Sequence, residues 1–180
     1  MAIREDKKLA MIHITKTGGV SLCNALGMVI TGHHNNYELY KKDYPDYFTF
    51  AVTRNPYERF ISAFFYMKFF DETYPEKARY SHIYENGMKT VMYEIEKRGT
   101  ALLKKQSWFI CEGNNIMVDK VFRNPQDAFD FISKKFDIEG ELKVENTSPH
   151  KYYDEYYDDE LMDLVYKYYK KDFKIFGYGK

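Results

Sequence analysis

Residues 9–26 read LAMIHITKTGGVSLCNAL, and this stretch changes its physical character three times. Leu9–Ile14 is a short apolar run with the length of one buried strand. Lys16–Gly19 then supplies a cation, a hydroxyl group and two glycines, and Val20–Ile30 favours a helix. Glycine lets a backbone come close to a ligand, and the first amides of a helix have no partners within it. The combination of strand, glycine turn and helix therefore predicts an anion cradle.

The composition is that of a globular protein with no charge bias. The chain has 180 residues, of which 44% are hydrophobic and 18% aromatic, so we expect one packed domain spanning residues 1–180. Lys and Arg number 27, and so do Asp and Glu. This balance gives no overall field for nucleic acid or an anionic membrane, so no nucleic-acid partner is expected and any anion site must be local.

The cysteines and the N-terminus exclude several other classes. Cys23 and Cys111 fall on predicted buried elements without CxxC or Cys/His ligand spacing, so we expect core residues rather than a disulfide or a metal site. The N-terminus carries charges where a signal peptide needs an apolar segment, and no apolar run is long enough to span a bilayer. We therefore expect a cytoplasmic protein without a membrane span.

A second strand also runs straight into a basic turn. Tyr47–Val52 is apolar, Arg54 follows it, and Tyr57–Phe70 predicts a largely buried helix that carries Ser62. An isolated arginine at a strand end usually forms a surface ion pair, here with Glu58. However, two cationic turns after neighbouring parallel strands face one crevice. This arrangement favours a ligand with two separated anionic groups.

The rest of the chain continues the alternation of strands and helices. Asp71–Arg98 suits one or two surface helices, and Ala101–Ile110 favours another helix. A third strand is predicted at Ile116–Phe122, an amphipathic helix at Pro125–Phe136 and a last helix at Asp158–Asp172. This order predicts an α/β fold with a parallel sheet.

The same stretches resemble a known family. HITKTGGVSL at 13–22 resembles the 5'-phosphosulfate loop of sulfotransferases that use 3'-phosphoadenosine 5'-phosphosulfate (PAPS), in the form HIPKTGGTS of the heparan-sulfate 2-O and related carbohydrate enzymes. FAVTRNPYERFISAFFY at 50–66 resembles their 3'-phosphate segment. KQSWFI at 105–110 and the tyrosine-rich segments at 145–160 and 168–178 agree with the family pattern. The resemblance implies a single domain with a P-loop-NTPase-like parallel sheet flanked by helices.

The resemblance also implies a role for each matching residue. Lys16 contacts the bridging oxygen between sulfate and phosphate and stabilises the leaving group, which makes a metal ion unnecessary. Arg54 and Ser62 hold the 3'-phosphate, and the hydroxyl groups of Thr17 and Ser21 donate to the 5'-phosphate. The backbone amides of one loop cradle that 5'-phosphate: Thr17, Gly18, Gly19, Val20 and Ser21.

A histidine is the expected general base. His33 and His34 follow the first helix, where several family members carry a histidine, and the pKa of histidine lies nearest neutrality. His34 aligns slightly better than His33, and His150 is the next candidate. The alternative interpretation is that Gly32–Asn36 is only a solvated loop. The resemblance implies that the acceptor is a hydroxyl group, most simply on a carbohydrate.

The sequence departs from the family pattern and leaves two other functions open. Thr15 replaces the usual proline, Val20 the usual threonine and Thr53 the usual valine. A P-loop-like nucleotide kinase would need a lysine after the glycines and an acidic residue for magnesium. A nucleotide- or glycan-binding module without catalysis would keep Arg54 but need no base. Since the chain is short for the family, its acceptor site is either open or completed by a second copy in a homo-oligomer.

Overall fold

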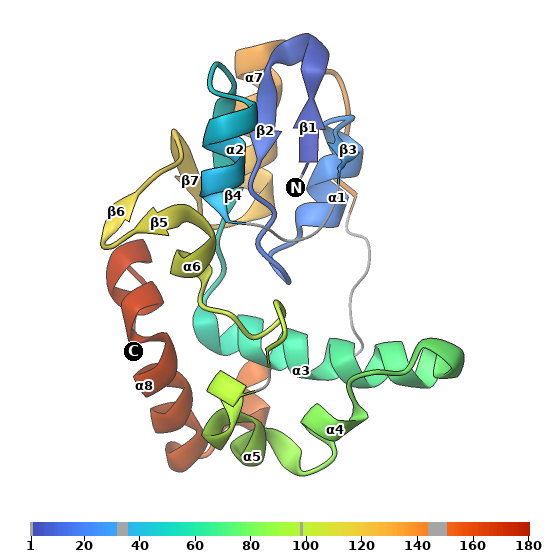
Figure 1. The fold of residues 1–180 in the computed structure, drawn as a ribbon, viewed down its shortest axis with the longest axis vertical. Helices are drawn as coiled ribbons and strands as arrows, with labels where there is room; N and C mark the ends of the chain where they lie inside the picture. The colour runs from blue at the N-terminus through green and yellow to red at the C-terminus, as the bar shows by residue number, and fades with distance from the viewer. Residues whose placement is uncertain (1, 32–35, 98, 144–150) are drawn as a thin grey trace. The chain divides into compact units, whose positions relative to one another are not determined.

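The computed structural model describes residues 2–31, 36–97, 99–143 and 151–180, and it divides into two compact units (Figure 1). The first unit consists of the described residues of Met1–Arg54 and Lys105–Asn146. The second consists of those of Asn55–Lys104 and Thr147–Lys180. The first unit holds the sheet, and the second is helical.

A five-stranded sheet with the order β3-β1-β2-β4-β7 forms the centre of the first unit. Its strands are β1 (Ala2–Arg4), β2 (Leu9–Met11), β3 (Val29–Ile30), β4 (Phe48–Val52) and β7 (Lys120–Phe122). The strands β2, β4 and β7 run parallel, with Met11 opposite Phe50 and Val52 opposite Phe122. These three strands confirm the predicted α/β fold. The antiparallel strands β1 and β3 add an edge that the sequence did not indicate.

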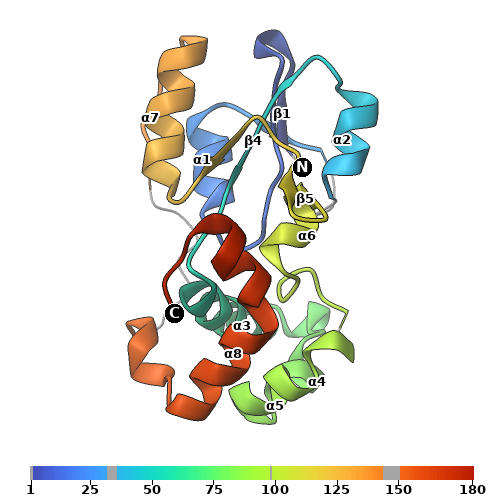
Figure 2. The same cartoon turned by 90° about the vertical axis from the view of Figure 1, so that its left-hand side faces the viewer.

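Helices cover both faces of this sheet, as Figure 2 shows. One face carries α1 (Gly19–Ala25) and α7 (Pro125–Phe136), and the other carries α2 (Tyr37–Asp43) and α6 (Gln106–Ile110). A hairpin of β5 (Cys111–Glu112) and β6 (Asn115–Ile116) follows α6. Alternate strand residues point toward α1 and α7, as the two-residue period of a strand requires. The core on that face includes Leu9, Met11, Leu22, Phe50, Val52, Phe122, Ala128 and Ile132.

Several element boundaries differ from the sequence predictions, three of them by more than a few residues. The helix predicted to run to Ile30 ends at Ala25, because Gly27 takes a φ of 61° and the β-branched Val29 and Ile30 pair with β1 instead. The strand predicted at Ile116–Phe122 is divided between the β5–β6 hairpin and β7. The helix predicted at Ala101–Ile110 forms only from Gln106. Each of these predictions extended a correct apolar run across a turn.

The second unit is built around the predicted buried helix after Arg54. Asn55 caps α3 (Pro56–Thr73) by accepting a hydrogen bond from the Tyr57 amide at 3.0 Å, and Pro56 occupies the first turn. The other helices are α4 (Ser81–Tyr84), α5 (Gly87–Tyr93) and α8 (Asp159–Phe176). Short 3₁₀ turns lie in this unit at Pro75–Lys77, Ile95–Lys97 and Tyr153–Tyr156, and another lies in the first unit at Glu5–Lys7. The last helix is longer than predicted and ends at Gly177, which has a φ of 67°.

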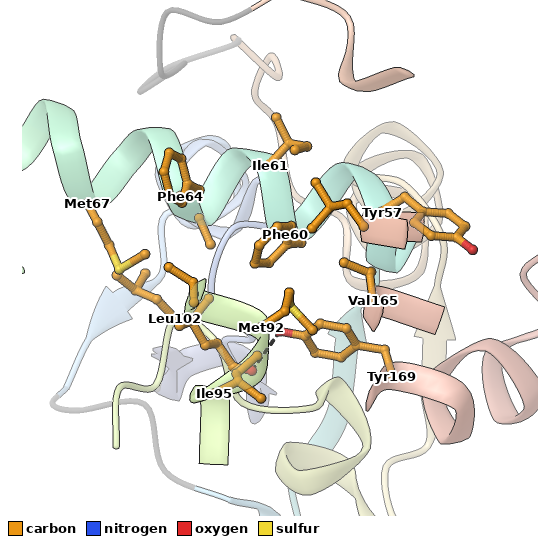
Figure 3. Packing of buried hydrophobic residues seen from close by; sticks show 14 of the residues in the cluster. Tyr57, Phe60, Ile61, Phe64, Met67, Met92, Ile95, Leu102, Val165 and Tyr169 are labelled. Atoms are coloured by element: carbon orange, nitrogen blue, oxygen red, sulfur yellow. Dashed lines mark hydrogen bonds between the residues drawn. The ribbon is translucent and has the colours of Figure 1, made fainter. Parts of the chain in front are cut away.

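The core of the second unit joins α3 to α8 and to the segment after α5 (Figure 3). Phe60 and Val165 are among its buried side chains, and the Tyr169 hydroxyl donates to the Leu103 carbonyl at 2.7 Å. Arg59 is also buried and donates to the carbonyls of Lys104 at 2.9 Å and Leu102 at 3.3 Å. The second arginine of the segment that follows β4 therefore has a structural role.

Candidate active site

The loop after β2 forms the predicted cradle in the first unit. The Ile12 amide donates to the Phe50 carbonyl at 2.9 Å, and the Ile14 amide then folds back onto the Ile12 carbonyl at 3.1 Å. This turn ends the strand. Lys16 follows with a φ of 64°, a left-handed conformation that costs a residue with a Cβ atom about 1–2 kcal/mol. The surrounding structure therefore holds Lys16 in a strained position.

Both glycines of the loop are required by protein neighbours. Gly18 has a φ of 80°, and a Cβ atom there would lie 2.6 Å from Pro125 Cγ at the start of α7. A Cβ atom on Gly19 would overlap the imidazole ring of His13. His13 is 8% exposed, and its ring packs against the loop at Gly19. The loop is consequently packed between β2 and α7.

The donors of the loop only partly match the roles that the resemblance implies. Gly19, Val20 and Ser21 begin α1, so their amides precede the hydrogen-bond ladder of the helix, in which the Leu22 amide donates to Gly18. The Thr17 hydroxyl, however, donates to the Ile14 carbonyl at 2.9 Å. It closes the loop rather than pointing its proton at a ligand. The expectation that this hydroxyl donates to phosphate is therefore corrected, and the Thr17 amide is left for that role.

Lys16 and Arg54 are close enough to influence each other. They follow β2 and β4, which are adjacent and parallel. Burial and, to a smaller extent, the positive charge of Arg54 together lower the pKa of Lys16 from 10.5 to about 8. The two cationic turns thus lie at one edge of the sheet, as predicted. Like charges held together in this way favour an anion between them.

The backbone around Arg54 is fixed from two sides. The Thr53 amide and hydroxyl both donate to the Phe122 carbonyl of β7, at 2.8 and 3.2 Å. The Arg54 amide donates to Gln106 Oε1 at 2.9 Å, and Gln106 Nε2 donates to the Arg54 carbonyl at 2.8 Å. Sequence reasoning did not find this contact. The only signal for it was the agreement of KQSWFI at 105–110 with the family pattern.

Of the other residues singled out in the sequence, Ser62 and the two cysteines lie in the described part of the structure. Ser62 lies on α3 in the second unit, where it is 5% exposed. His33, His34 and His150 lie outside the described residues. Cys23 is buried, which raises the pKa of its thiol to about 12. Cys111 is half-buried, so only Cys23 fits the expectation of a core cysteine.

A hollow of about 440 Å³ opens along α1, next to the cradle. Ser21 belongs both to the first turn of α1 and to the wall of this hollow. The hollow therefore adjoins the first turn of α1. The lining residues are Arg4, Ser21, Asn24, Ala25, Gly27, Glu139, Gly140, Glu141 and Lys143.

The described part of the chain shows neither a cluster of metal ligands nor a helix suited to a membrane. Within residues 2–31, 36–97, 99–143 and 151–180, no three His, Cys, Asp or Glu side chains gather as metal ligands would. Over the same residues, no helix combines the length and the apolar character that crossing a bilayer requires.

The fold and the site define an α/β protein with a glycine loop and two cations at the carboxyl edge of its parallel strands. The chain matches the model of the sulfotransferase family over residues 1–179 and belongs to this family. It is thus a sulfotransferase, an enzyme that transfers a sulfuryl group, which confirms the family suggested by the sequence motifs. No curated protein and no solved structure matches the chain.

Gly18 offers a test of the packing beneath the loop. We expect Gly18→Ala to destabilise the protein more than Gly113→Ala, which serves as the matched control. Both glycines have positive φ, so both variants incur about 1–2 kcal/mol of left-handed strain, but a Cβ atom at Gly113 meets nothing within 4 Å. Urea denaturation measures the difference. Equal losses in the two variants would show that Pro125 does not constrain the loop.

Lys16→Met should stabilise the protein at pH 7 by about 1–3 kcal/mol, since one unit of pKa shift corresponds to about 1.4 kcal/mol. The pKa of Lys16 is about 8 in the folded state, below its ordinary value of 10.5. Between these values the unfolded chain keeps a proton that the folded chain has lost, so the contribution of Lys16 to stability rises with pH.

The free energy of unfolding, measured from pH 7 to pH 10, should therefore rise less steeply in Lys16→Met than in the natural protein. The exposed Lys143→Met is the control for removing a lysine. If Lys16→Met and the natural protein show the same pH dependence, the charge on Lys16 carries no penalty in the folded state.

Proposed function

We propose that this sulfotransferase moves the sulfuryl group of PAPS to a hydroxyl group on a carbohydrate. The observation that carries the proposal is the placement of Lys16 beside Arg54 at the ends of adjacent parallel strands. Burial and the nearby positive charge of Arg54 both lower the pKa of Lys16, so a ligand with substantial negative charge would be favoured beside these two cations. PAPS carries such charge at two separated positions.

The donor set supports a ligand with two phosphate positions. The loop amides and Lys16 would hold the 5'-phosphate, whose charge the start of α1 also favours. The guanidinium group of Arg54 would hold the 3'-phosphate, because its planar fork matches phosphate oxygens. Ser62 is proposed as the second ligand of that phosphate. The hollow beside Ser21 would be the place for the nucleoside.

The proposed chemistry depends on charge and position rather than on a covalent intermediate. PAPS would supply the activated sulfuryl group. Lys16 and the loop amides would stabilise the negative charge that builds up on the departing phosphate. Their rigid placement would align donor and acceptor, as in phosphoryl transfer, where positioning and electrostatics dominate.

The acceptor hydroxyl must also lose a proton. We propose His34 as its general base, with His33 as the alternative, because a histidine can accept a proton near neutral pH. No metal ion is included in the proposal, since Lys16 and the amides supply positive charge. The two compact units are proposed to act as one sulfotransferase domain, and the family match extends across both of them.

Calorimetry tests the nucleotide half of the proposal. The natural protein should bind adenosine 3',5'-bisphosphate more tightly than ATP or adenosine 5'-monophosphate. Arg54→Ala should weaken the bisphosphate about 10- to 100-fold, because a hydrogen bond to a charged group contributes about 1.5–3 kcal/mol. Lys134→Ala, an exposed lysine late in α7, is the control and should leave binding unchanged. Binding of ATP in preference to the bisphosphate would contradict the proposal in favour of a kinase.

Sulfate transfer tests the catalytic half. With PAPS as donor, we expect transfer to carbohydrate hydroxyl groups and little or none to phenols or peptides. Lys16→Ala should lower turnover about 10²- to 10³-fold, the usual effect of removing one group that stabilises developing charge. His34→Ala should lower turnover about 10²- to 10⁴-fold, and the same loss in His33→Ala instead would assign the base to His33. Unchanged turnover in Lys16→Ala would refute the assigned mechanism, and unchanged turnover in both histidine variants would refute the proposed base.

A further inference from the structure

One buried side chain holds both polar groups of the Arg54 backbone. Gln106 Oε1 accepts a hydrogen bond from the Arg54 amide at 2.9 Å, and Gln106 Nε2 donates to the Arg54 carbonyl at 2.8 Å. Gln106 is 0% exposed and is the first residue of α6, so the packing around it fixes both its position and its orientation. The pair of bonds imitates the two bonds that a residue in a neighbouring strand would make.

The position of Arg54 explains why such a contact is useful. Strand β4 ends at Val52, and the Thr53 amide still pairs with Phe122, the last residue of β7. One residue further on, β7 has ended, and the chain enters α3 only after Asn55. The planar amide of Gln106 continues the pairing by one residue. It therefore extends the ordered edge of the sheet to the residue that carries the cation.

The placement of the guanidinium group depends on this backbone. Arginine has a long side chain, so a small change in the backbone angles at Arg54 displaces the guanidinium group by more than the same change displaces its Cβ atom. A misplacement of about 1 Å in a positioning group can cost an enzyme on the order of 10²-fold. Fixing both the N–H and the C=O of Arg54 fixes the direction in which its side chain leaves the chain.

We propose that Gln106 is a positioning residue that aims Arg54 at the 3'-phosphate of the bound nucleotide. This inference rests on the proposed function, because it needs a ligand with a phosphate at that position. Gln106 acts through Arg54 and does not touch the ligand. Glutamine suits the task because its amide carries one acceptor and one donor side, and the backbone of Arg54 offers the complementary pair.

A change at Gln106 should affect the binding of only one of the two phosphates of the ligand. A residue that only stabilises the fold would affect the binding of every nucleotide to a similar extent. A residue that aims Arg54 should affect only nucleotides with a 3'-phosphate. The comparison of adenosine 3',5'-bisphosphate with adenosine 5'-monophosphate therefore separates the two roles without any measurement of activity.

Calorimetry on four proteins tests the proposal: the natural chain, Gln106→Met, Arg54→Ala and the double variant. Gln106→Met keeps the approximate volume of the side chain and removes both hydrogen bonds. It should weaken the bisphosphate about 10- to 100-fold and change the affinity for the 5'-monophosphate less than twofold. In the Arg54→Ala background, Gln106→Met should have no further effect on the bisphosphate, because the two residues act as one unit. Gln126→Met, a change to the exposed glutamine on α7, is the matched control and should bind both ligands normally.

Two results would overturn the proposal while leaving the proposed function intact. These are an equal loss of affinity for both nucleotides in Gln106→Met, and an additive loss in the double variant. If Gln106→Met does not fold, the same comparisons apply to Gln106→Glu, which keeps the shape and the acceptor but loses the donor. If the natural protein shows no preference for the 3'-phosphate, the proposed function fails, and this inference fails with it.

Discussion

The proximity of two positive charges is the constraint on which this site depends. Lys16 and Arg54 come from different strands, and the parallel pairing of β2 with β4 brings them to one edge of the sheet. Their repulsion and the burial of Lys16 both oppose the folded state, as the lowered pKa of Lys16 shows. The rest of the first unit must supply enough stability to keep them there. An anion bound beside the two cations would offset their repulsion. The free energy of folding that this repulsion lowers would then be regained on binding.

The protein holds this arrangement through contacts beneath the loop rather than through the cations themselves. His13 lies under Gly19, Pro125 lies against Gly18, and the Thr17 hydroxyl closes the turn onto Ile14. These contacts come from β2, from α7 and from the loop itself. The left-handed conformation of Lys16 is tolerated because its neighbours are fixed in this way. Because these contacts hold the loop in place, they lower the entropy that binding must overcome.

Local patterns in the sequence predicted the parts of the fold that depend on local physics. The apolar runs before Lys16 and Arg54 became β2 and β4, and Pro125–Phe136 became α7 with its predicted bounds. The missed features depend on partners that are distant in sequence. Strand β3 exists because Val29 and Ile30 meet β1, and the contact of Gln106 with Arg54 joins residues 52 positions apart. A hydroxyl such as that of Thr17 can serve a ligand or the loop, and only the three-dimensional geometry decides between them.

The segment RNPYER at 54–59 shows how one short motif can serve both the site and the core. Arg54 precedes the helix, at the carboxyl edge of the sheet, where a guanidinium group can meet a ligand. Arg59 lies inside α3, where its donors are taken by the carbonyls of Leu102 and Lys104. Burial lowers the pKa of Arg59, while the nearby Tyr169 and Asp172 act in the opposite direction and favour its charge. Because Asn55 and Pro56 fix where the helix begins, they also fix which arginine faces the edge of the sheet and which one enters the core. The same few residues thus define the helix boundary and the chemistry of the edge, so the two cannot vary independently.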